Sequence, residues 1–308
     1  MSRRQLVECV PNFSEGRDSS VVEAIAGVIA ATPGAMLLAG ESDADHNRSV
    51  ITFAGPPRPV IEAAFRAAAK AAELIDLNRH AGVHPRIGAT DVIPLVPLSG
   101  ITIEECAGLA HQLGERIWRE LEIPVYYYEA AALNPGRRRL EQIRQGGFEE
   151  LRQVAEGNPD RRPDAGGPAP HPTAGATAIG ARKLLLAYNI NLDTADVEIA
   201  KAIARRIRAS SGGLAHVKAI GVHLDSRSQA QVSLNITDYE STLLPVVFEA
   251  VRSEAARLGA AIASSEIIGL MPAQALAMAA AHYLKIGNLG PESILENRLL
   301  SVLLDCGE

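Results

Sequence analysis

The residues best suited to chemistry lie in a histidine-rich stretch that reads RHAGVHPR over 79–86. His80 and His84 are four residues apart, a spacing that would place two metal ligands on one face of a helix. Gly82 and Pro85 oppose a continuous helix, and the proline favours extended backbone at the residue before it. We therefore favour a loop with a stiffly held imidazole, which can act as a general base near neutral pH. A structural, hydrogen-bonding histidine is the plainer alternative.

A second polar cluster, ESDADHNR, spans 41–48 between two predicted strands. Asp43, Asp45 and Asn47 alternate as in a calcium loop, but the glycine, the bidentate glutamate and the flanking helices of an EF-hand are missing. The cluster is therefore either a solvated hairpin or an acidic rim for a cationic ligand. In the second case Arg48 could bind a carboxylate.

A third segment, rich in proline and glycine, covers 157–175 and continues as ATAIGARK to residue 183. Its glycines would let a flat or anionic ligand approach the backbone closely. The segment matches neither GxGxxG nor GxxxxGK[ST], so it does not predict nucleotide binding. The alternative is a plain linker, which would divide the chain into a front and a back part.

The elements that must position these clusters follow one order in each part of the chain. Alternating and helical apolar spacing predicts strand, helix, strand, strand, helix, strand in the back part, which is the split βαβ, ferredoxin-like arrangement. The front part repeats that order and adds a further helix and strand. We therefore predict an α+β fold with two ferredoxin-like α/β sandwich subdomains. The strands are expected at 5–10, 35–41, 49–54, 91–96, 125–128, 184–190, 217–224, 230–237 and 261–268, and the helices at 19–31, 59–74, 102–120, 194–210, 243–258 and over most of 272–304.

Composition narrows the classes of partner. The 308 residues carry 30 Lys and Arg against 36 Asp and Glu, a net charge of −6 that argues against a general nucleic-acid binder. Three scattered cysteines favour a reducing compartment over a disulfide framework. No segment has the roughly 20 apolar residues of a membrane span, and no signal peptide is evident. We expect a soluble, cytoplasmic protein.

Several long motifs together resemble the formiminotransferase domain, which in some organisms is fused to a cyclodeaminase. The resemblance runs from about residue 5 to residue 285, and we expect the chain to lack the cyclodeaminase part. The motifs are VECVPNFSEGRD, SDADHNRSVITFAGPP, AAELIDLNRHAGVHPRIGATDVIPLVP, HPTAGATAIGARK and LLLAYNINL.

This resemblance implies two subdomains, placed here at 1–178 and 179–308, with folate bound between them, and a homodimer. It implies transfer of a formimino group between 5-formiminotetrahydrofolate and L-glutamate in histidine degradation, with a tetrahydrofolate derivative as co-substrate and no metal. The family's catalytic histidine corresponds to His84. Its folate-contacting loop corresponds to Gly166, Gly167, Pro168, Ala169, Pro170, His171, Pro172, Thr173, Ala174 and Gly175.

Two departures from the family pattern affect substrate preference. Ala165 stands where an aromatic residue often follows Pro-Asp, and Ala39-Gly40-Glu41 replaces an Asp-Val-Asp. Glu41 keeps a carboxylate at the last position and could steady the cationic amidinium. The candidates for holding the substrate carboxylates are Arg48, Arg86, Arg182 and Lys183.

Three other functions remain open at this stage. Formyl transfer from 5-formyltetrahydrofolate to glutamate would use the same scaffold, because the two donors differ only by oxygen against nitrogen. A folate-binding protein without turnover is a second alternative, although an intact His84 argues against it. A metal-dependent amidohydrolase or deaminase is a third, and the absence of a ligand triad argues against that one.

Overall fold

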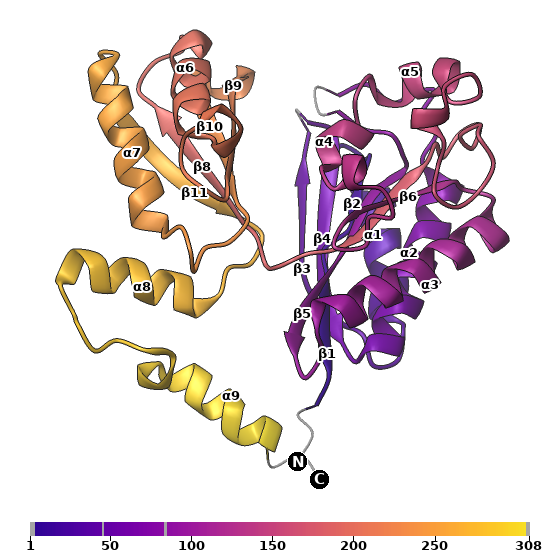
Figure 1. Cartoon of the computed structure of the whole chain (residues 1–308), viewed down its shortest axis with the longest axis horizontal. Coiled ribbons are helices and arrows are strands. Elements are labelled where there is room, and N and C mark those ends of the chain that lie inside the picture. Colours follow the sequence, from indigo (N-terminus) through magenta and orange to yellow (C-terminus); the bar gives the residue numbers. More distant parts are fainter. Residues whose placement is uncertain (1–3, 45, 83–84, 306–308) are drawn as a thin grey trace. The chain divides into compact units, whose positions relative to one another are not determined.

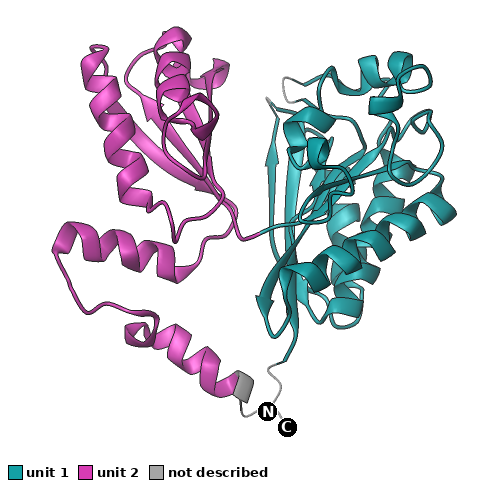
Figure 2. Cartoon of the chain, in the orientation of Figure 1, with its two compact units in different colours: residues 1–182 teal, residues 183–308 magenta. Residues whose placement is uncertain are grey.

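The computed structural model describes residues 4–44, 46–82 and 85–305. The chain forms two compact units, Met1–Arg182 and Lys183–Glu308, which are described separately below (Figure 2). The expected α+β class is confirmed, because each unit contains a sheet with helices packed against it (Figure 1).

Unit 1 contains the predicted βαββαβ order. Its strands run β3–β4–β1/β2–β5 across the sheet, with antiparallel neighbours. The first strand is interrupted at Pro11, which cannot donate to a ladder, and continues as β2 between β4 and β5. The bounds are β1 Leu6–Cys9, β2 Asn12–Phe13, α1 Ser19–Ala30, β3 Met36–Asp43, β4 Arg48–Gly55, α2 Pro57–Leu74 and β5 Thr90–Ser99.

The proline- and glycine-rich segment does not link the two units, which corrects the linker interpretation. It stays within unit 1 and returns the chain to β7 (Thr177–Ala181), which inserts between β5 and β6 (Val125–Glu129) and runs parallel to both. The strand TAIGA is built from small residues. At Gly180 an added Cβ would lie 2.6 Å from the ring of Tyr128, so a larger residue could not enter this central position.

Helices cover both faces of the unit 1 sheet. The helices α1, α2 and α3 (Ile103–Leu121) enclose the largest apolar core on one face (Figure 1). The helix α3 begins with a capping box in which Thr102 and Glu105 exchange hydrogen bonds. On the opposite face, α4 (Leu140–Ile143) and α5 (Gly147–Val154) pack over β5, β7 and β6 through a smaller core. The sequence pattern did not predict β7, α4 or α5.

Unit 2 is a ferredoxin-like sandwich, as predicted. Its four antiparallel strands have the order β11–β8–β10–β9, and the apolar core lies between them and the helices. Two C-terminal helices follow the last strand. The bounds are β8 Leu186–Leu192, α6 Val197–Ile207, β9 Val217–Leu224, β10 Gln229–Ile236, α7 Leu244–Arg257, β11 Ile262–Ile268, α8 Ala273–Leu284 and α9 Leu295–Asp305.

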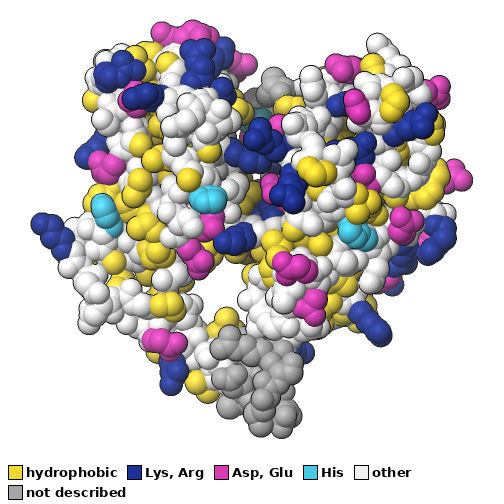
Figure 3. Space-filling model, in the orientation of Figure 1, with side chains coloured by type: hydrophobic (Ala, Val, Ile, Leu, Met, Phe, Trp, Pro, Cys, Tyr) yellow, Lys and Arg dark blue, Asp and Glu magenta, His cyan; other side chains and the backbone are white. Residues whose placement is uncertain are grey.

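Two surface properties bear on possible partners. Among the described residues, every helix is too short or too polar to cross a bilayer. Basic and acidic side chains are interspersed on the face shown in Figure 3, which agrees with the near balance of charge in the composition.

We expect a Gly88→Ala substitution to destabilise unit 1. A Cβ at residue 88 would lie 2.0 Å from the carbonyl oxygen of Ala176, a backbone atom that cannot move without disturbing the entry to β7. Such overpacking costs about 1–3 kcal/mol. The matched control is Gly27→Ala, where the added methyl group of an exposed helix position meets nothing within 4 Å. The free energy of unfolding of the Gly27→Ala control, measured in urea, should rise by up to about 1 kcal/mol, because alanine is the better helix former. Equal midpoints for the two variants would contradict the close approach at Gly88.

A candidate active-site pocket in unit 1

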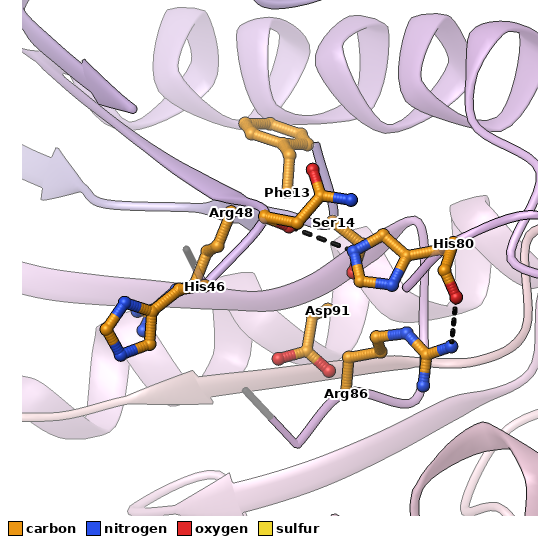
Figure 4. Close-up of a pocket in the computed structure, with 8 residues that line it drawn as sticks. Phe13, Ser14, His46, Arg48, His80, Arg86 and Asp91 are labelled. Atoms are coloured by element: carbon orange, nitrogen blue, oxygen red, sulfur yellow. Dashed lines mark hydrogen bonds between the residues drawn. The ribbon is translucent and has the colours of Figure 1, made fainter. Parts of the chain in front are cut away.

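A small pocket forms where three loops of unit 1 meet. They are the loop after β2, the β3–β4 turn and the loop that precedes β5, so the polar cluster at 41–48 and the histidine-rich stretch are brought together. The described residues that line the pocket are Phe13, Ser14, His46, Asn47, Arg48, His80, Arg86 and Asp91 (Figure 4).

Asn47 joins the three loops through hydrogen bonds. Its side-chain oxygen accepts from the backbone N–H of Gly16 (3.0 Å), and its side-chain nitrogen donates to the carbonyl of Ala81 (3.1 Å). Its own carbonyl accepts from Nε2 of His80 (2.9 Å). The backbone of Asn47 is left-handed, with φ of 47°, a conformation that asparagine tolerates better than most residues. A buried asparagine therefore fixes the relative positions of the pocket's loops.

The hydrogen bond to Asn47 also sets the tautomer of His80. A carbonyl can only accept, so Nε2 of His80 carries the proton and Nδ1 keeps its lone pair. Burial lowers the pKa of His80 below its usual value; the hydrogen bond to Asn47 opposes this shift, and the positive charge of Arg86 adds to it. Nδ1 is buried and has no hydrogen-bond partner among the described residues. His80 is therefore a neutral imidazole near pH 7.

Two arginine–carboxylate pairs connect the pocket to α4 and α5. Arg86 donates from both terminal nitrogens to Glu149, at 2.8 and 3.1 Å. It also donates to the carbonyl of His80 at 3.2 Å (Figure 4). Arg144 donates to one oxygen of the buried Asp91, whose other oxygen accepts from the backbone N–H of Ile87 at 2.8 Å. Both ends of the segment from 86 to 91 are thus held by charged hydrogen bonds.

Arg48 contributes a partly desolvated cation. It begins β4 directly opposite Asp43 of β3, and its side chain lines the pocket. Burial lowers the pKa of Arg48 to about 10, and the nearby positive charge of Arg144 adds to that effect, whereas Asp91 and Asp43 oppose it. Arg48 is therefore still a cation at neutral pH, and it is suited to bind an anion.

The structure separates the four candidate carboxylate-binding residues. Arg48 and Arg86 line the pocket. Lys183 belongs to unit 2 and forms an ion pair with Asp238 at 2.7 Å. Arg182 follows β7, where its backbone N–H donates to the carbonyl of Leu95.

The two residues expected to act in catalysis are placed differently. Glu41 lies on β3 opposite Val50, is exposed, and is not among the residues that line the pocket. His84 lies outside the described residues. Of the described residues in the same stretch, His80 and Arg86 line the pocket.

The expected folate loop is tied to the histidine-rich stretch. Residues 171 and 175 exchange backbone hydrogen bonds of 2.8 and 3.0 Å, which makes the end of the loop a tight turn. Leu77 and Ala89 donate backbone N–H groups to the carbonyls of Thr173 and Ala174, both at 2.9 Å. Gly175 has φ of 72°, and a Cβ there would lie 2.1 Å from the carbonyl oxygen of Ile87, so only glycine fits.

Several pocket residues received no role from the sequence. Asp91 follows the histidine-rich stretch closely and could have been included because a carboxylate there begins a buried strand. Asn47 gave a weaker signal, its place between His46 and Arg48 in a turn. Arg144 and Glu149, which bond to the lining residues Asp91 and Arg86, gave none, because Arg144 lies in the turn that ends α4, Glu149 lies on α5, and the sequence pattern predicted neither helix. In the part of the chain that the structure describes, no group of three His, Cys, Asp or Glu side chains could hold a metal.

Comparisons with known proteins cover both units. The family model for the N-terminal subdomain of the formiminotransferase domain matches residues 6–182. The family model for the formiminotransferase domain matches residues 187–301. The glutamate formimidoyltransferase of Streptococcus pyogenes serotype M1 is 46% identical over 96% of this chain and 99% of its own. The glutamate formimidoyltransferase of Thermoplasma acidophilum is 46% identical over 96% of this chain and 97% of its own. The formimidoyltransferase-cyclodeaminase of Sus scrofa is 45% identical over 92% of this chain and 53% of its own.

The role of Asn47 predicts a graded response to substitution. Asn47→Gly keeps the left-handed backbone but removes both side-chain hydrogen bonds, which should cost about 1–3 kcal/mol. Asn47→Ala removes the same bonds and adds about 1–2 kcal/mol for a left-handed residue with a Cβ. Urea unfolding should therefore rank wild type above the glycine variant and the glycine variant above the alanine variant. An alanine variant as stable as the glycine variant would contradict the backbone assignment.

Proposed function

The chain belongs to the formiminotransferase family, and we propose that it transfers the formimino group between 5-formiminotetrahydrofolate and L-glutamate. One observation carries the proposal. The similarity to glutamate formimidoyltransferases runs over 96% of this chain and 97–99% of the relatives, so both units and the pocket are included. Tetrahydrofolate is then a co-substrate, and the reaction is a step in histidine degradation.

The chemistry of the transfer requires a base, an anion-binding group and a site for the pterin ring. The amino group of glutamate, once it has lost a proton, attacks the carbon of the formimino group on N5 of the folate. A bond forms between the glutamate nitrogen and that carbon, the N5–carbon bond breaks, and N5 takes up a proton. A neutral imidazole can remove the first proton near pH 7.

We propose His84 as that base. The support is the match of residues 79–86 to the family motif and the position of two described residues of that motif, His80 and Arg86, at the pocket. His80 also has a fixed ring, because its Nε2 donates to the carbonyl of Asn47 while Nδ1 keeps a lone pair, so a direct comparison of variants of the two histidines separates their roles.

We propose Arg48 for a carboxylate of glutamate and residues 166–175 for folate. Arg48 is a cation at the pocket wall. The hydrogen bonds from Leu77 and Ala89 to the end of the 166–175 loop support a folate site beside the histidine-rich stretch. Glu41, proposed to steady the cationic amidinium, lies on the same hairpin but does not line the pocket, whereas Asp91 is a carboxylate that does.

A homodimer in the cytoplasm completes the proposal. The strand β3 pairs only with β4 among the described residues, and it exposes Met36, Leu37 and Leu38, which supports association at this edge. Cys9 and Cys106 are free and buried, which suits a reducing compartment. Light scattering of the purified protein measures the oligomeric state.

The deciding assay measures glutamate-dependent release of tetrahydrofolate from 5-formiminotetrahydrofolate. Release together with formation of N-formiminoglutamate is the expected result. A parallel reaction with 5-formyltetrahydrofolate separates formimino from formyl transfer. If the protein binds folate but turns over neither donor, the proposed transferase activity is wrong and the protein is a folate-binding protein.

We expect His84→Ala to lower turnover on the order of 10²–10⁴-fold, the usual contribution of a general base. The wild-type rate should rise with pH through the pKa of an imidazole, because only the neutral form accepts a proton. Folate affinity should change much less. His80→Ala is the control and should cost far less in turnover. If His80→Ala abolished activity while His84→Ala retained it, the base would be His80.

We expect Arg48→Gln to weaken glutamate binding, because the variant loses the cation at the pocket wall. The KM for glutamate should rise on the order of 10-fold or more, as is typical when one partner of a desolvated charge pair is removed. Arg66→Gln is the matched control, since Arg66 forms only a surface pair with Glu62 on α2. An unchanged KM in the Arg48 variant would remove this residue from the glutamate site.

A further inference from the structure

Arg86 lines the pocket, but its hydrogen bonds point away from a role in binding substrate. One terminal nitrogen donates to Oε2 of Glu149 at 3.1 Å, and the other donates to Oε1 of Glu149 at 2.8 Å and to the carbonyl of His80 at 3.2 Å. The two parallel bonds form the bidentate arrangement in which arginine and carboxylate fit best. A substrate carboxylate would have to displace Glu149 from the fork that it occupies.

Glu149 is fixed in place by its neighbours on α5. Leu151 is buried in the small core that α4 and α5 share with β5, β6 and β7, and Phe148 is buried in the larger core of unit 1. The backbone N–H of Phe148 donates to the carbonyl of Arg86 at 2.9 Å. Two consecutive residues of α5 therefore hold the backbone and the side chain of Arg86. Although Glu149 is 63% exposed, its partner is only 12% exposed, so this pair differs from ordinary surface ion pairs.

The same contacts fix the positions of His80 and Arg86, near the two ends of the histidine-rich stretch. At one end, the ring of His80 bonds to Asn47 and its carbonyl accepts from Arg86. At the other end, Arg86 bonds to Phe148 and Glu149. Reacting groups must be held to within about 0.5 Å of their productive positions, and a charged clamp on a packed helix can supply that precision.

We propose that Glu149 is a positioning residue for the transfer reaction, and that Arg86 fixes the two described ends of the histidine-rich stretch, at His80 and at its own backbone, and does not bind the substrate. The proposal rests on the proposed function for its kinetic consequences, and on the geometry alone for its structural ones. It assigns a task to α5, an element that the catalytic residues do not otherwise require.

The test compares Glu149→Ala with Glu150→Ala in the full-length chain. The two residues are adjacent on the first turn of α5 and both are exposed, so each variant removes one carboxylate from the same place in the helix. Glu149→Ala should lower kcat about tenfold, because small displacements of reacting groups are costly. The KM for glutamate should stay within about twofold of wild type, because the glutamate site itself is unchanged. Glu150→Ala should match wild type in both constants.

Hydrogen–deuterium exchange of the same proteins gives a readout that does not depend on activity. Peptides from 77–91 should exchange faster in Glu149→Ala than in Glu150→Ala, while peptides from unit 2 should be unchanged. If Glu149→Ala unfolds, Glu149→Gln, which keeps the volume but not the charge, is held to the same criteria.

Two results would overturn the proposal. The first is a Glu149→Ala variant that equals Glu150→Ala in both kcat and exchange. The second is a lower KM for glutamate at unchanged kcat, because that would mean that the released Arg86 binds the substrate. If the wild-type chain turns over neither donor, the proposed function fails, and the exchange of 77–91 still decides whether Glu149 holds this stretch.

Discussion

The pocket depends on one buried asparagine in a left-handed conformation. Asn47, in the β3–β4 turn, supplies a donor, an acceptor and its own carbonyl to two other loops, so Gly16, His80 and Ala81 are all positioned from a single residue. Buried backbone groups of loops need partners, and here one side chain satisfies two of them. The ring of His80 depends on this arrangement for its tautomer. The segment that leads into β5 is also held by two arginine–carboxylate pairs, one at Arg86 and one at Asp91.

Much of the fold could be predicted from periodicity, because both βαββαβ units carry strands and helices with regular apolar spacing. The run 184–190 and the helix spacing from 197 to 207 are examples. The extension of the unit 1 sheet could not be predicted in this way. The strand TAIGA at 177–181 is central and buried on both faces, so it shows no alternation, and its alanines and glycine suggest a loop. The helices α4 and α5 are too short for a 3.6-residue pattern to appear.

The side chains of the candidate site could likewise be predicted only in part from the sequence. The clusters at 41–48 and 79–91 were recognisable by residue type, yet only the fold brings them together, because the β3–β4 turn and the loop before β5 lie at the same end of the strands. Arg144 and Glu149 do not line the pocket themselves, and they follow the lining residues that they bond, Asp91 and Arg86, by 53 and 63 residues. Pairing over such distances leaves no local signal, because an arginine and a glutamate on an exposed helix are common everywhere.

The late insertion of β7 also has a consequence for synthesis of the chain. Val92 of β5 pairs with Ala178, and Val125 of β6 pairs with Thr177, so neither strand acquires its inner neighbour until residue 181 has been made. At ribosomal rates of about 5–20 residues per second, the backbone N–H and C=O groups of β5 and β6 that pair with β7 stay unpaired for several seconds. Unit 2 begins at residue 183, immediately after that closure. The first unit can therefore complete its sheet once residue 181 has left the ribosome, while the second unit is still being made.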